Sequence, residues 1–97
     1  MVKHIVSFKL NGTPEQRLAV ASAFKEALLK LPLVIEPLQS MEVGINQNPN
    51  EDWDVVLTAV VPTMSDVDIY AKHPAHVAAA ALLAGHKEAR ACVDYEF

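Results

Sequence analysis

Two histidines flank a proline in the segment Tyr70–Val77, where His73 and His76 lie three residues apart. A third histidine, His4, falls on the more apolar side of the first alternating stretch. An imidazole can donate or accept a proton near neutral pH, since its ordinary pKa is about 6.5. Imidazoles that face an apolar space are either hydrogen-bonded core residues or the acid and base groups of a small site. The sequence leaves both interpretations open for His4 and His76, and as a core residue His4 would be bonded to Tyr70 or Asp94.

A tyrosine and an aspartate complete the candidate set. Tyr70 precedes the histidine pair, and Asp94 lies in the last alternating stretch. Enolisation of a carbonyl compound needs a base at the carbon acid and a donor at the developing enolate oxygen. We expect His76 to be the base, with Asp94 accepting a hydrogen bond from its other ring nitrogen. Tyr70 or His4 would donate to the oxygen, and the pocket would lie between the sheet and the helices.

The histidines also raise a metal alternative. Catalytic zinc needs three protein ligands and an open position, which His73, His76 and His4 would supply. The proline is expected to splay the first two imidazoles, so the sequence predicts neither a metal ion nor a cofactor. The single cysteine, Cys92, excludes an internal disulfide. It is expected to be a small buried hydrophobe and not a reactive thiol.

The composition restricts the class of protein. The chain has 97 residues, of which 52% are hydrophobic and 21% are charged. This predicts one globular domain over residues 1–97 with a thin core. The net charge is −4 and the basic residues form no cluster, which argues against nucleic-acid binding. A signal-peptide pattern and a run of about 18 apolar residues are both lacking, so we expect a cytoplasmic protein with no membrane span.

Alternation and capping patterns predict the elements that must position these residues. Alternating stretches predict strands at residues 2–10, 39–45, 53–61 and 91–97. The pattern Thr13–Gln16 is typical of a capping box and starts a helix that ends at Pro32. The apolar stripe of that helix is Leu18, Ala21, Phe24, Leu28 and Leu31. A second helix is expected from a cap near Ser65, with a break at His73-Pro74 and a further segment to Ala84.

The resulting order is β-α-β-β-α-β, with the second helix split at His73-Pro74. This α+β order is that of the ferredoxin-like fold, a four-stranded antiparallel sheet with its helices on one face. The last strand places Val93, Tyr95 and Phe97 on one side. Because exposed apolar sheet is unfavourable in water, we expect a second copy of the chain to cover the open face.

Four segments resemble the stress-responsive α/β-barrel (Dabb) family. They are Met1–Val6, Met41–Gly44, Tyr70–Val77 and Val93–Tyr95. The resemblance runs from residue 2 to residue 95 in the right order and spacing. It implies a dimeric α+β barrel in which two ferredoxin-like sheets close together. It implies no single activity, because the wider superfamily includes cofactor-free monooxygenases, lactone isomerases and haem enzymes.

One member type that the chain is similar to is a plant polyketide cyclase, olivetolic acid cyclase. That enzyme closes a linear polyketide by aldol chemistry without a metal or organic cofactor. The similarity implies catalytic roles for His4, Tyr70 and His76, and it matches Asp94 to an aspartate in the cyclase's last strand. The small residues Ala78–Ala81 replace bulkier pocket residues, so the substrate does not carry over.

Together, the residues and the resemblance predict a homodimer that binds a small apolar or carbonyl-containing molecule. One alternative is a cofactor-independent cyclase, lyase or isomerase that uses His76, Tyr70 and His4, with Asp94, for proton transfer. The other is a structural, stress-related dimer that has no ligand.

Overall fold

Strict alternation over Val2–Leu10 forms the inner strand β1. Its even-numbered side chains are buried and its odd-numbered side chains are half-buried, as the pattern predicts. The computed structural model describes all of residues 1–97. The other elements are α1 Pro14–Leu29, a 3-10 helix at Leu31–Leu33, β2 Ser40–Ile45, β3 Val55–Val61, α2 Met64–Lys72, α3 Pro74–Ala81 and β4 Lys87–Glu96.

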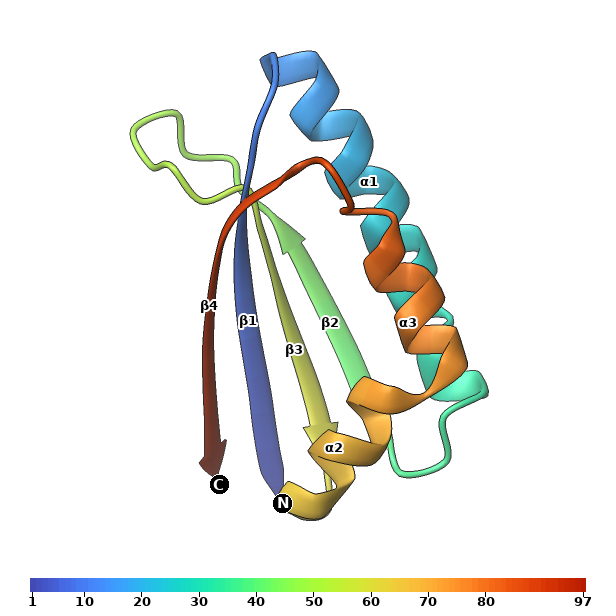
Figure 1. Cartoon of the computed structure of the whole chain (residues 1–97). Coiled ribbons are helices and arrows are strands. Elements are labelled where there is room, and N and C mark those ends of the chain that lie inside the picture. Colours follow the sequence, from blue (N-terminus) through green and yellow to red (C-terminus); the bar gives the residue numbers. More distant parts are fainter.

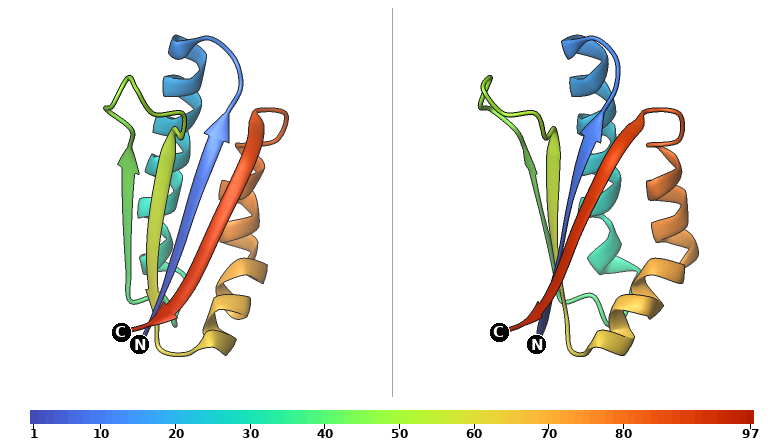
Figure 2. Two further views of the ribbon diagram at one scale, coloured as in Figure 1. Left: turned by 90° about the vertical axis from the view of Figure 1, so that its left-hand side faces the viewer. Right: turned by 60° about the vertical axis from the view of Figure 1, so that its left-hand side comes forward.

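The four strands form one antiparallel sheet in the order β2-β3-β1-β4. All the helices lie against one face of the sheet (Figure 1), and the opposite face is bare (Figure 2). This ferredoxin-like arrangement confirms the predicted fold class. Because β1 pairs with β4, the two ends of the chain lie side by side, and the Phe97 amide donates to the Met1 carbonyl.

Local capping decides where α1 and α2 begin. Thr13 and Gln16 form the predicted capping box at α1. At α2 the N-cap is Thr63, so the cap predicted near Ser65 is wrong by two residues. Thr63 is favoured because one oxygen of the Asp66 carboxylate accepts hydrogen bonds from both its amide and its hydroxyl.

The chain breaks between α2 and α3 at His73-Pro74, as predicted. The backbone of His73 is extended (φ −63°, ψ 135°), which is the conformation that a following proline favours. Nδ1 of His73 accepts a hydrogen bond from the Ala75 amide at 3.1 Å, so this histidine is the N-cap of α3. The helix ends at Ala81, short of the predicted end, and Gly85 (φ +79°) then turns the chain into β4.

One cluster of 18 buried residues forms the core between the sheet and the helices. From α1 it includes Ala21, Phe24 and Leu28, which belong to the predicted stripe. The assignment of Leu18 to the stripe is wrong, because this side chain is 55% exposed. Leu18 lines a hollow between the start of α1 and the loop after β2, so its side chain is not covered by the sheet.

The sheet face opposite the helices carries exposed apolar side chains. They include Val56 on β3, Val93 and Tyr95 on β4, and Phe97 just beyond it. β4 begins at Lys87, earlier than predicted, because its pairing with β1 continues to Leu10. None of the helices is long and apolar enough to cross a membrane.

Candidate functional site

His4 is placed at the site by β1. Its side chain points toward the helices, as all even-numbered residues of β1 do, and it is the one buried polar residue of the chain. The antiparallel register sets Asp94 of β4 opposite His4. Nδ1 of His4 donates to Oδ1 of Asp94 across 2.5 Å, because a carboxylate only accepts. His4 is therefore a hydrogen-bonded core histidine, and in its neutral form Nε2 keeps a lone pair that has no partner.

Tyr70 is the buried residue of α2, and its ring contacts both imidazoles. The ring centroids lie 5.7 Å from His4, edge to face, and 4.5 Å from His76. The Tyr70 hydroxyl is the only buried side-chain polar atom without a hydrogen-bond partner. Burial raises the pKa of Tyr70 well above its ordinary value, so the phenol stays protonated and acts as a donor.

His76 lies in the first turn of α3, and its tautomer is fixed by α2. Nδ1 donates to the Ala71 carbonyl at 2.9 Å, so Nε2 carries the lone pair in the neutral ring. Burial is the main cause that lowers the pKa of His76 below the ordinary value of 6.5; the Ala71 hydrogen bond opposes this, and nearby His4 and Arg90 add to it. The ring is therefore neutral at pH 7 and able to accept a proton.

One detail of the predicted constellation is wrong. Asp94 orients His4 and not His76, because the register of β4 brings it to β1, while Ala71 occupies the second nitrogen of His76. The Tyr70 hydroxyl is buried in the single chain. The structure does bring His4, Tyr70 and His76 together into one row of rings.

Cys92 joins this group, which the sequence reasoning missed. Its Sγ lies 3.6 Å from Nδ1 of His4 and 3.8 and 3.9 Å from the two carboxylate oxygens of Asp94. The side chain is half-buried against the core, as a small hydrophobe would be, and burial raises the pKa of its thiol. Arg90 is on the same face of β4. Residues 90, 92 and 94 alternate along β4 and so share one face of the strand, and this spacing could have predicted that Arg90 and Cys92 lie beside Asp94.

The three histidines do not form the metal site that the sequence raised as an alternative. In His73 and His76 the Nδ1 atoms bond to Ala75 and Ala71, and the donor atoms of the three histidines do not come within metal-ligand spacing of one another. The donor atoms with metal-ligand spacing belong instead to His4, Cys92 and Asp94.

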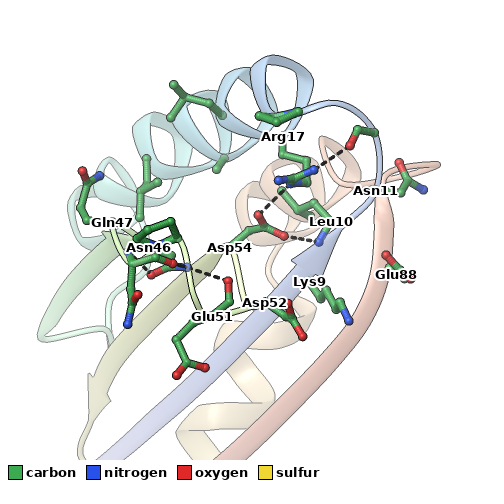
Figure 3. A pocket seen from close by; sticks show the side chains of 17 residues that line it. Lys9, Leu10, Asn11, Arg17, Asn46, Gln47, Glu51, Asp52, Asp54 and Glu88 are labelled. Atoms are coloured by element: carbon green, nitrogen blue, oxygen red, sulfur yellow. Dashed lines mark hydrogen bonds and ion pairs between the residues drawn. The ribbon is translucent and has the colours of Figure 1, made fainter.

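Two hollows in the protein surface lie away from the rings of His4, Tyr70 and His76. One of about 670 Å³ opens between the start of α1 and the loop after β2 (Figure 3). Arg17 reaches across it to Asp54, whose carboxylate also accepts from the Leu10 amide at 2.7 Å. Leu10 is six residues along β1 from His4, or about 20 Å. The Asp54 carboxylate therefore connects β1 to α1.

The other hollow, of about 350 Å³, lies on the open sheet face and includes Trp53 and Val56 in its lining. Neither hollow contains His4, Tyr70 or His76. Neither hollow is therefore the expected pocket between the sheet and the helices. At the place where that pocket was expected, the Tyr70 ring lies against both imidazoles.

The sequence profile of the stress-responsive A/B barrel domain, Dabb, matches residues 2–97. The chain belongs to this family. A comparison of the Dabb chain with curated proteins found no match.

Several solved structures share the fold of the Dabb chain. A dimeric protein of unknown function with a ferredoxin-like fold from Bacteroides fragilis is 50% identical, with a TM-score of 0.96 over 99% of this chain and 95% of that one. A dimeric ferredoxin-like protein of unknown function from Thermobifida fusca is 25% identical, with a TM-score of 0.78 over 99% and 90%. A structure described as an antibiotic biosynthesis monooxygenase is 16% identical, with a TM-score of 0.78 over 100% and 98%, which shows the fold alone.

Proposed function

We propose that this Dabb protein is a homodimer that binds a small carbonyl compound beside Tyr70 and moves a proton on it. The observation that carries the proposal is the unpartnered Tyr70 hydroxyl, which lies in a ring that contacts His4 and His76. A buried polar group without a partner costs about 1–3 kcal/mol, and such groups are rare in folded proteins. A carbonyl oxygen of a ligand would accept the hydrogen bond that this hydroxyl lacks.

The two histidines supply complementary chemistry in this scheme. His76 is neutral, and its free Nε2 takes a proton from the carbon next to the carbonyl. The bonding pair of that C–H bond forms the C=C bond of an enolate, and the negative charge moves to the oxygen that faces Tyr70. The phenol stabilises that charge as a neutral donor. His4, held by Asp94, is the second imidazole within reach of the same ring.

A ligand would enter from the side of β4. The Asp94 side chain on that strand is 24% exposed, and Cys92 is half-buried. The Nε2 atoms of His4 and His76 have no hydrogen-bond partner in the protein, and neither atom is fully buried, whereas the Tyr70 hydroxyl is. Because the Tyr70 hydroxyl is buried, a ligand can reach it only if the Tyr70 ring shifts or α3 moves away from β4. β4 is an edge strand that pairs only with β1.

The homodimer is proposed from the open sheet face and from the relatives. Val56, Val93 and Tyr95 leave apolar surface exposed there. The 50% identical relative and the 25% identical relative are both described as dimeric. A second copy that packs on this face would remove the apolar side chains from water.

The test is α-proton exchange of an apolar ketone. Phenylacetone in D₂O with EDTA is followed by NMR, with and without the protein. We expect the protein to accelerate loss of the α-proton signal, and His76→Gln to lower that acceleration by about 100-fold or more. His86→Gln is the matched control on a histidine outside the row. Unchanged exchange in His76→Gln would remove this residue from the reaction, and exchange that the wild type does not accelerate would contradict the proposed proton transfer.

A further inference from the structure

We propose that His4, Cys92 and Asp94 form a binding site for a divalent cation of the zinc class. Nδ1 of His4, Sγ of Cys92 and a carboxylate oxygen of Asp94 all lie within 4.8 Å of one another. They come from two adjacent antiparallel strands, β1 and β4, whose register places His4 opposite Asp94. The site goes beyond the proposed proton transfer, which uses no metal.

The distances between the donor atoms suit a tetrahedral ion. Zinc binds sulfur at about 2.3 Å and nitrogen or oxygen at about 2.0–2.2 Å, so neighbouring donors lie roughly 3.3–3.6 Å apart. Sγ of Cys92 is 3.6 Å from Nδ1 of His4 and 3.8 Å from Oδ1 of Asp94. The 2.5 Å between His4 and Asp94 is a hydrogen-bond distance and must open by nearly 1 Å. The Asp94 side chain is 24% exposed and lies on an edge strand, so its carboxylate can turn away from His4 toward the solvent side.

The types of donor select the class of cation. A thiolate, an imidazole and one carboxylate favour zinc or cobalt over magnesium or calcium, which prefer oxygen donors alone. Three protein ligands leave the fourth position for water or a ligand oxygen, which is the arrangement of catalytic rather than structural zinc.

Binding of the cation would remove one proton from the site and move another. The cation displaces the thiol proton of Cys92, which passes to solvent, since a coordinated thiol is deprotonated. The ring proton of His4 moves from Nδ1 to Nε2, so His4 becomes a donor on the side of Tyr70. The metal-bound and metal-free forms would then present different hydrogen-bonding patterns to a ligand at the same row of rings.

The experiment titrates the full-length, tag-free chain with CoCl₂ after treatment with EDTA and gel filtration. We expect a near-ultraviolet thiolate-to-cobalt absorption and intense visible bands of tetrahedral cobalt, both removed by excess ZnCl₂. Cys92→Ser should abolish the thiolate band, and Asp94→Asn should weaken cobalt affinity by about 10-fold or more, since even supporting residues of metal sites have effects of that size. Both changes lie on an edge strand, so the test does not depend on a core variant.

His86→Gln is the control, because His86 lies just before β4, outside the cluster, and caps no helix. Absence of the thiolate band, or equal affinity in the wild type and Asp94→Asn, would overturn the proposal. The titration contains no ketone and the exchange assay contains EDTA. The two experiments therefore test metal binding and proton transfer independently of each other.

Discussion

Tyr70 is the residue on which the two histidines of the site meet, and its hydroxyl has no partner. Removing that oxygen while keeping the ring removes a buried polar group and leaves the packing nearly intact. We expect Tyr70→Phe to raise the free energy of unfolding of the ligand-free protein by about 1 kcal/mol or more. Urea unfolding at constant m-value measures it. A lower urea midpoint in the variant would mean that the hydroxyl has a partner.

The same variant should behave in the opposite way toward a ligand. If the hydroxyl donates to a carbonyl oxygen, Tyr70→Phe loses acceleration of ketone exchange although the fold is more stable. This combination of a gain in stability with a loss of function is typical of active-site residues. Equal exchange rates in the variant and the wild type would remove Tyr70 as the donor.

His76 should give the exchange reaction its pH dependence. Burial lowers its pKa below 6.5, and only the neutral ring has the Nε2 lone pair. As the pH falls, exchange should therefore stay high through pH 6.5 and decline only at lower pH, as the ring is protonated. A rate profile beside an NMR titration of the His76 ring measures both. A decline centred above pH 6.5 would contradict the assignment.

The sequence was sufficient to name the rings, but it left open whether Asp94 bonds to His76 or to His4. His4, Tyr70 and His76 were found from residue type and family resemblance. The partner of Asp94 depends on the register between β1 and β4, and His4 and Asp94 are 90 residues apart. No local pattern encodes that register, since it is set by the packing of the whole sheet. Cys92 was missed as a neighbour of His4 for the same reason.

At the level of elements, the break at His73-Pro74 controls how α2 and α3 carry Tyr70 and His76. His73 caps α3 through a hydrogen bond from the Ala75 amide to its Nδ1. We expect His73→Ala to destabilise the protein by about 1 kcal/mol, the usual effect of losing an N-cap. His73→Asn keeps an acceptor at this position and should recover most of that loss. Urea unfolding of the pair measures it, and equal loss in both variants would show that the cap is not the cause.

Element boundaries were predicted where a local interaction decides them. The Thr13–Gln16 box and the proline break are local, and both were confirmed. The start of β4 at Lys87 was predicted late, because pairing with β1 and not local alternation extends this strand. Leu18 was predicted to be buried from the local spacing of apolar residues, but its exposure depends on which parts of the folded chain lie next to α1.

At the scale of the whole molecule, the open sheet face should hold two chains together. Val56 lies on an inner strand of that face and is 38% exposed. A charge at its position would be buried unpaired in the interface. Val56→Glu should therefore shift the mass in light scattering from twice 10.6 kDa toward 10.6 kDa.

Val77→Glu is the matched control, because Val77 is an exposed valine on α3, on the other side of the molecule. It should leave the mass unchanged. A single-chain mass for the wild type at micromolar concentration, or a dimer that survives Val56→Glu, would contradict this arrangement.

The pairing of β1 with β4 joins two strands that are far apart in the sequence. His4 and Asp94 are 90 residues apart, so His4 leaves the ribosome long before Asp94 does. A nascent or prematurely terminated chain therefore lacks the polar cluster, even when its helices have formed. Contacts of such high sequence separation form late and slowly. Any chemistry at this cluster thus begins only after β4 has been synthesised and has paired with β1.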